Sequence, residues 1–254
     1  MTDLGALREK LEKGTATQAD LQNFASLLGR EAGREIVEIL EVNGIEAASE
    51  YTLTRLREVY GEITDFANSV QNQIYADAGV GLRAIAPEFD KQGAQAVASH
   101  LTQAQTEDAS PMFEKRTETF SQNVVDRHMR TNAEAASSVG MEVRVSREYD
   151  GRGLRHGTKH AEGCAWCLSR ECNNLPYDEA YALGVFQRHE GCHCIITNTN
   201  KKGRTTRQNA SGGWTEVSQD DIIRRKEDNA EPPTKESKEI SRFAKYIGMP
   251  ITAT

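Results

Sequence analysis

The sequence predicts an α+β protein: a mostly α-helical N-terminal region with long helices, followed by a small α+β module. Up to about residue 140, apolar residues recur every three or four positions, which is the spacing of an amphipathic helix. Near residue 143 this spacing changes to the alternation of a strand, and all five cysteines lie between residues 164 and 194. Only 37% of the 254 residues are hydrophobic and 6% aromatic, which favours amphipathic helices over a large, densely packed sheet.

Two long helices are predicted first. One follows Thr17, a suitable N-cap, and ends before Gly44; its apolar stripe comprises Leu21, Phe24, Leu27, Leu28, Ile36, Ile39 and Leu40. The other runs from Tyr51 to Gly79, a natural stop, with the stripe Leu53, Leu56, Val59, Tyr60, Ile63, Phe66, Val70 and Ile74. We expect both stripes to pack within the chain, with any uncovered part available to a partner. Long helices with polar outer faces are typical of stalks, so residues 1–140 are interpreted as a helical stalk or docking domain.

Two further helices are predicted at about residues 89–105 and 111–138. The second opens with Ser110–Pro111, which fits an N-cap followed by proline at the first helical position. His100 and His128 have no second metal-ligand type nearby in the sequence, so they are interpreted as ordinary helix residues.

The α+β module is predicted to span residues 141–215. Val143 and Val145 alternate with charged neighbours, which predicts a strand, and a short strand is expected around Trp214. Between the cysteines, four apolar residues fall on helical spacing: Tyr177, Tyr181, Val185 and Phe186. We expect them to form a helix that packs over the cysteine cluster.

The remaining residues, 216–254, are interpreted as a basic and polar C-terminal tail. This segment is poor in hydrophobic residues and contains Pro232–Pro233. Charge also divides the chain: residues 1–150 contain 15 Lys and Arg against 25 Asp and Glu, whereas residues 151–254 contain 16 against 13. The two parts of the chain are therefore expected to have different functions.

Spacing among the cysteines points to a metal site. The N-terminal sequence lacks the basic and apolar segments of a signal peptide, so we expect folding in a reducing cytosol, where disulfides are rare. Cys164 and Cys167 have the spacing of a metal knuckle. Five candidates compete for the four positions of a closed tetrahedral site: Cys164, Cys167, His189, Cys192 and Cys194.

The expected metal is a structural Zn²⁺ ion. A histidine inside the pattern favours zinc, although the spacing is also compatible with an iron–sulfur cluster. Cys172 is interpreted as a buried apolar residue or a spare thiol that can replace one of the five. If residues 192–195 are extended, Cys192 and Cys194 point to one face and His193 to the other, which makes His193 the least favoured ligand.

These motifs resemble a known family. The stretches GCAWC (Gly163 to Cys167) and RHEGCHC (Arg188 to Cys194), behind a long helical region, resemble the phage minor head, or head morphogenesis, proteins of the Mu F-like group. That family commonly closes with His-Pro-x-Cys-Arg-Cys. Here Glu190 and Gly191 stand where proline and a variable residue would be, and His193 replaces arginine. These departures leave the five candidate ligands unchanged.

The resemblance implies a virion structural protein and not an enzyme. Such a protein is a low-copy minor capsid component, assembled in the host cytoplasm and associated with the phage portal or major capsid protein inside the head, without membrane contact. A basic patch after the cysteine module is a candidate for contact with the DNA backbone: Lys201, Lys202, Arg204 and Arg207.

The alternative interpretation is a zinc-stabilised His-Asn-His-type endonuclease. Such nucleases also pair Cys-x-x-Cys with a later His-x-x-Cys, and use further histidines to activate water. His156 and His160 are the available candidates. The sequence has no Asp-His or His-His pair where such an enzyme needs its base, so the structural interpretation is preferred.

Overall fold

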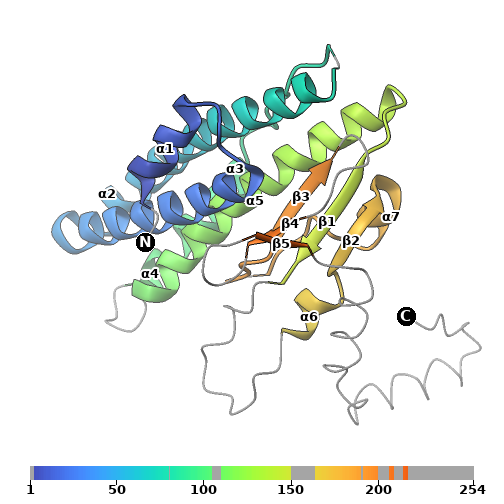
Figure 1. The fold of residues 1–254 in the computed structure, drawn as a ribbon. Helices are drawn as coiled ribbons and strands as arrows, with labels where there is room; N and C mark the ends of the chain where they lie inside the picture. The colour runs from blue at the N-terminus through green and yellow to red at the C-terminus, as the bar shows by residue number, and fades with distance from the viewer. Residues whose placement is uncertain are drawn as a thin grey trace, which may run out of the picture.

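The computed structural model describes residues 3–79, 81–104, 110–149, 164–189, 191–199, 206–208 and 214–216 (Figure 1). The elements follow in the order α1 (Leu4–Glu12), α2 (Gln18–Asp77), α3 (Lys91–Ser99), α4 (Leu101–Ala104), α5 (Ser110–Ser138), β1 (Arg144–Glu148), α6 (Ala165–Leu168), β2 (Cys172–Pro176), α7 (Tyr177–Ala182), β3 (Ile195–Thr199), β4 (Thr206–Gln208) and β5 (Trp214–Glu216). The predicted α+β class, with a helical N-terminal region and a small sheet after it, is confirmed.

Helix α2 is a hairpin of two helical arms. Gly44 interrupts it with φ 82° and ψ 179°, a conformation that glycine adopts without a Cβ penalty. Two contacts between the arms show that they run antiparallel. The Phe24 and Phe66 rings stack at 4.8 Å between centroids, and Arg55 Nε lies 2.5 Å from Glu35 Oε2. The predicted start is confirmed as well: the Thr17 side chain accepts from the Asp20 N–H at 3.1 Å.

Helix α5 packs closely along the first arm of α2. A Cβ at Gly29 would lie 2.7 Å from Glu118 Cα, and one at Gly33 would lie 2.8 Å from Glu114 Cα. Two glycines one turn apart therefore allow the two backbones to approach. Helix α5 lies alongside the hairpin and also contacts β3, while α2 contacts β3 as well (Figure 1).

The apolar stripes of α2 are covered by the chain itself, as expected for intramolecular packing. Ten of their residues are at most 5% exposed: Leu21, Phe24, Leu28, Ile36, Leu40, Leu56, Val59, Ile63, Phe66 and Val70. Leu27, Ile39, Leu53, Tyr60 and Ile74 pack partly buried against the same core. These stripes therefore leave no broad apolar face for a partner protein, which corrects the suggestion that they act as a docking surface.

One helical prediction needs correction, and one helix was not predicted. The helix expected at 89–105 is instead two helices, α3 and α4, separated at His100. Asp90 caps the start of α3, and the His100 N–H closes its last turn by donating to the Val97 carbonyl. Helix α1 was not predicted; the Asp3 side chain accepts from the Ala6 N–H at 2.7 Å, and Leu7 is fully buried.

Strand β1 is the centre of an antiparallel sheet with the order β2-β1-β3, and the predicted strand around Val145 is confirmed. Val145 lies opposite Leu175 of β2 and Asn198 of β3. The outer edge of β3 is covered by two glutamines of α2: Gln18 Oε1 accepts from the Asn198 N–H at 2.8 Å, and Gln22 Oε1 accepts from the Ile196 N–H at 3.0 Å. Side chains one helical turn apart thus pair with alternate residues of the strand.

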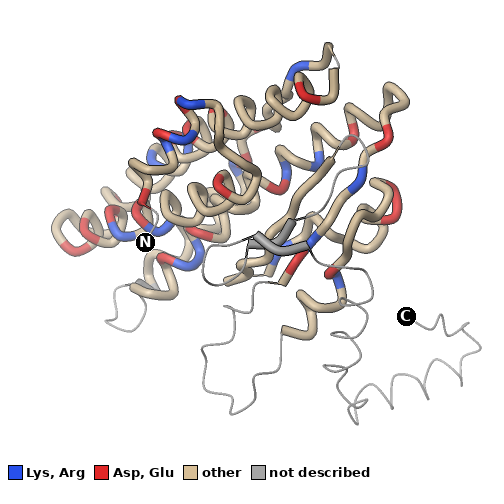
Figure 2. Tube along the Cα trace, in the orientation of Figure 1, with Lys and Arg blue, Asp and Glu red and all other residues tan. Residues whose placement is uncertain are grey.

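Helical region and sheet share one core. A single cluster of buried side chains contains Phe24 and Val125 from the helices together with Val145 and Ile196 from the sheet. The composition boundary at residue 140 therefore lies within a continuously packed structure. Acidic and basic residues are interspersed along α1 and α2 (Figure 2).

Helix α7 does not pack over the cysteines as expected. It ends at Ala182, its Tyr181 side chain is 57% exposed, and Ala180 and Val185 belong to the main core. The short helix beside the cysteines is α6. The expected strand at Trp214 is confirmed as β5, which pairs antiparallel with β4.

Several predicted features lie outside the described residues. They are His156, His160, the side chains of the patch Lys201, Lys202, Arg204 and Arg207, and the tail beyond Glu216 with Pro232–Pro233. Within the described residues, no helix combines the length and apolar character needed to cross a membrane.

Candidate metal centre

The five predicted ligands come together at one end of the sheet. Cys164 is the N-cap of α6 and Cys167 lies within that helix, and their Sγ atoms lie 3.2 and 3.0 Å from His189 Nε2. Cys167 Sγ also lies 3.6 Å from Cys192 Sγ. The donor atoms form two groups, each within 4.8 Å, that share Cys167: Cys164, Cys167 and His189 in one, and Cys167, Cys192 and Cys194 in the other. The arrangement can hold a metal ion.

One sulfur–sulfur distance fits a tetrahedral ion with sulfur ligands. Two thiolates at about 2.3 Å from one ion in tetrahedral geometry are roughly 3.8 Å apart, close to the separation of Cys167 and Cys192. A disulfide would need about 2.05 Å, and none of the five cysteines forms one. Cys167, Cys192 and Cys194 are each 1% exposed, while Cys164 and His189 are half-buried.

Two short turns present the donors. In the first, the Leu168 N–H donates to the Cys164 carbonyl at 2.9 Å, which closes the single turn of α6. In the second, Gly191 has φ 74° and the Cys192 N–H donates to the His189 carbonyl at 3.1 Å. Glycine in the left-handed region thus allows His189 and Cys192 to face the same site.

Trp166 packs against the candidate ligand His189. Its ring meets the His189 ring edge to face, with centroids 5.2 Å apart, and the Arg170 guanidinium lies 3.8 Å from the Trp166 ring centroid. Trp166 therefore buries one side of the imidazole while the other side faces the thiols.

The neighbouring Cys172 and His193 do not join the cluster. Cys172 is 2% exposed within the main core, where its Sγ lies 3.8 Å from the Val145 carbonyl oxygen. His193 points away from the thiols, with Nδ1 3.6 Å from Glu118 Oε1 of α5. Both placements agree with the expectations for a buried thiol and for the alternate face of an extended segment.

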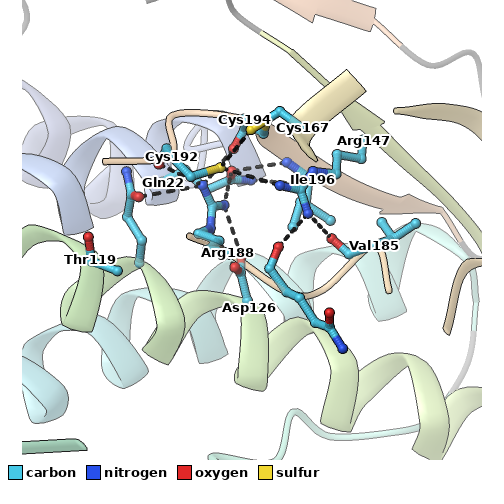
Figure 3. Close-up of polar contacts among 12 residues, drawn as sticks. Gln22, Thr119, Asp126, Arg147, Cys167, Val185, Arg188, Cys192, Cys194 and Ile196 are labelled. Atoms are coloured by element: carbon cyan, nitrogen blue, oxygen red, sulfur yellow. Dashed lines mark hydrogen bonds and ion pairs between the residues drawn. The ribbon is translucent and has the colours of Figure 1, made fainter. Parts of the chain in front are cut away.

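Arg188 connects residues 188–194, here called the cysteine loop, to helices α2 and α5 (Figure 3). Its guanidinium forms an ion pair with both carboxylate oxygens of Asp126, and the two side chains are 1% and 2% exposed. Nη1 donates to the Cys194 carbonyl at 2.8 Å and Nη2 to Gln22 Oε1 at 3.1 Å. Burial raises the pKa of Asp126 and the charge of Arg188 opposes that shift. Burial lowers the pKa of Arg188, but the pairing with Asp126 raises it above its ordinary value.

Arg147 of β1 is a second buried arginine at the site, with no exposed surface. Its Nη1 donates to the carbonyls of Val185 and Gln187 at 2.6 and 2.5 Å, and its Nη2 donates to Cys192 Sγ at 3.3 Å. Neither Arg147 nor Arg188 was predicted to contribute to the site from the sequence.

The thiols share their protons unequally. Hydrogen bonds from the Cys167 and Cys194 thiols lower the pKa of Cys192, and the two arginines lower it further against the effect of burial. The same hydrogen bonds to Cys192 and Cys194, together with burial, raise the pKa of Cys167. Metal binding displaces thiol protons, and the lowered pKa of Cys192 favours the thiolate that a metal would bind.

No protein-family model matches this chain, and no match is found among curated proteins or solved structures.

Proposed function

We propose that the five Cys and His residues hold one structural zinc ion, and that the protein is a phage minor head protein, a low-copy structural component of the virion. The observation that carries the proposal is the set of five soft donors, three of them buried, in two groups that share Cys167. Structural zinc sites use four protein ligands, whereas catalytic sites keep one position open for water. Five donors compete for four positions here, which favours the structural type.

The ion would join parts of the chain that have little other support. The site forms a small cluster of buried side chains apart from the main core, consisting of Tyr149, Cys167, Leu168, Cys192 and Cys194. Zinc adds binding free energy to folding, about 10–16 kcal/mol in zinc-finger peptides. It would therefore fix α6 and the turn at Gly191 against the end of the sheet.

Zinc is preferred over an iron–sulfur cluster because His189 Nε2 lies within 3.2 Å of two sulfurs. The test is elemental analysis of the purified full-length chain, with about one zinc per chain expected. Freshly purified protein without zinc, or with iron and sulfide in its place, would overturn this part of the proposal.

The phage assignment is supported by the two stretches that resemble the Mu F-like group. The GCAWC stretch contributes Cys164 and Cys167, the RHEGCHC stretch contributes His189, Cys192 and Cys194, and these side chains meet at one site. We propose the portal or major capsid protein as partner, and DNA as a possible ligand of the basic patch that begins at Lys201. The protein would have no catalytic role.

Quantitative mass spectrometry of purified particles tests the assignment. The protein should be present at low copy number in virions or procapsids of a phage that encodes it. Its absence from both would contradict the proposal. Cleavage of plasmid DNA in the presence of magnesium or manganese, lost in His160→Ala, would favour the zinc-stabilised endonuclease instead.

A further inference from the structure

Arg147 is a buried cation that lacks a carboxylate partner. Among the described residues, no Asp or Glu forms an ion pair with it. The nearby carboxylate of Asp126 has both oxygens engaged by Arg188. A guanidinium with no exposed surface is costly unless a negative charge lies beside it.

The nearest candidate for that charge is the cysteine cluster. Arg147 Nη2 donates to Cys192 Sγ at 3.3 Å, while its two other hydrogen bonds go to neutral carbonyl oxygens. A divalent ion with two thiolates is neutral, with three it carries −1, and with four it carries −2. Three thiolates therefore balance the single charge of Arg147.

We infer that Arg147 is the counter-cation of a three-cysteine, one-histidine zinc centre formed by Cys164, Cys167, His189 and Cys192, with Cys194 outside the ligand set. This inference builds on the proposed zinc site. It assigns the ligands, and it gives Arg147 the role of a positioning residue that stabilises the charge on Cys192.

Three contacts select these ligands. Cys164 and Cys167 form the knuckle, and both sulfurs lie within 3.2 Å of His189 Nε2. Cys192 receives the Arg147 hydrogen bond and lies 3.6 Å from Cys167, near the edge length of a tetrahedral site. Cys194 lies within the second donor group, but the Arg147 hydrogen bond goes to Cys192.

Cobalt substitution tests the ligand set in the full-length chain. The intensity of the sulfur-to-cobalt charge-transfer band reports the number of thiolates bound to Co²⁺. We expect three sulfurs in the wild type, three in Cys194→Ser and two in Cys192→Ser, with zinc retained in Cys194→Ser. Four sulfurs in the wild type, or an unchanged spectrum in Cys192→Ser, would overturn the assignment.

Variants of Arg147 test the counter-cation. Outer-shell partners of metal ligands typically change affinity by about 10–100-fold. We therefore expect Arg147→Met to weaken Zn²⁺ binding by at least about tenfold in chelator competition. Arg147→Lys, which keeps the charge but loses the planar fork, should lie closer to the wild type.

If Arg147 only holds the Val185 and Gln187 carbonyls, Arg147→Met should lower the stability of the apo and zinc-bound forms equally. Zinc affinity in Arg147→Met equal to that of the wild type would therefore overturn the proposal. If Arg147→Met does not fold, the Arg147→Lys affinity and the two cysteine variants decide. Wild-type protein that binds no zinc would instead refute the proposed metal site itself.

Discussion

Arg188 and Asp126 form a buried ion pair that joins the cysteine loop to α5, with 2.9 Å between Arg188 Nη2 and Asp126 Oδ1. Because the same guanidinium also donates to the Cys194 carbonyl, the position of the loop depends on a helix more than 60 residues away in the sequence. The candidate metal centre is therefore held in place partly by the helical region.

The first prediction concerns this pair. Arg188→Met should destabilise the protein by about 3–5 kcal/mol, because it leaves the Asp126 carboxylate buried and unpaired. Adding Asp126→Leu should recover part of that loss. Arg8→Ala is the control, since its ion pair with Glu62 is largely exposed and should contribute less than about 1 kcal/mol. Guanidinium unfolding measures each value. A double variant no more stable than Arg188→Met would contradict the prediction.

The second prediction concerns the close contact of α2 with α5. Gly29→Ala and Gly33→Ala should each destabilise by about 1–3 kcal/mol, because the new methyl groups would meet the backbone of α5. Gly61→Ala is a matched control in the second arm of the same helix, where nothing lies within 4 Å. It should be neutral or stabilise by up to about 1 kcal/mol. Thermal unfolding of the three variants compares them, and equal effects at all three sites would argue against the close packing.

The third prediction is a pH dependence from His128. Burial lowers its pKa from 6.5 to about 4, and its Nε2–H lies 2.9 Å from Asn68 Oδ1, so the folded protein holds a neutral ring. The unfolded chain binds a proton below about pH 6.5, and stability should therefore fall as the pH drops from there towards 4. The full effect is about 3 kcal/mol, from 1.36 kcal/mol for each pH unit.

The control for this effect is His128→Gln, which keeps a donor for Asn68 and removes the titration. Unfolding midpoints of the two proteins at several pH values between 7.5 and 4.5 should show a steeper decline for the wild type. Because both proteins keep the same five candidate ligands, loss of metal at low pH affects them alike. Parallel curves would refute the assignment.

Caps, glycine breaks and residue alternation in the sequence predicted the helix and strand boundaries that depend on neighbouring residues. The Thr17 cap, the break at Gly44 and the alternation at Val143 and Val145 each depend on neighbouring residues, and each is confirmed. The two halves of the cysteine cluster were also predictable, because the chelating spacing within each half is a local pattern.

Long-range packing was not predictable in the same way. The hairpin of α2, the glutamine pairs on β3 and the burial of Arg188 all depend on contacts between distant residues. The burial of Arg147 was predictable from the sequence. It follows Val143 and Val145 at intervals of two, so the alternation that predicted β1 also places Arg147 on the buried face. The helix expected over the cysteines was misplaced because helical spacing does not determine which surface a helix covers.

The last prediction concerns removal of the metal. Because β1, β2 and β3 contribute to the main core through Val145, Cys172 and Ile196, the sheet should remain folded without zinc. The separate cluster around Cys167 and Leu168 has few apolar contacts, so α6 and the turn at Gly191 should open when a chelator removes the ion or in Cys164→Ser. Amide hydrogen exchange should show loss of protection confined to these two segments, with α2 and α5 unchanged, and re-added zinc should restore it in the chelated wild type but not in Cys164→Ser. A loss of protection that spreads through α2 and α5 would show that the ion supports the whole fold, and unchanged exchange at α6 would show that the ion holds neither segment.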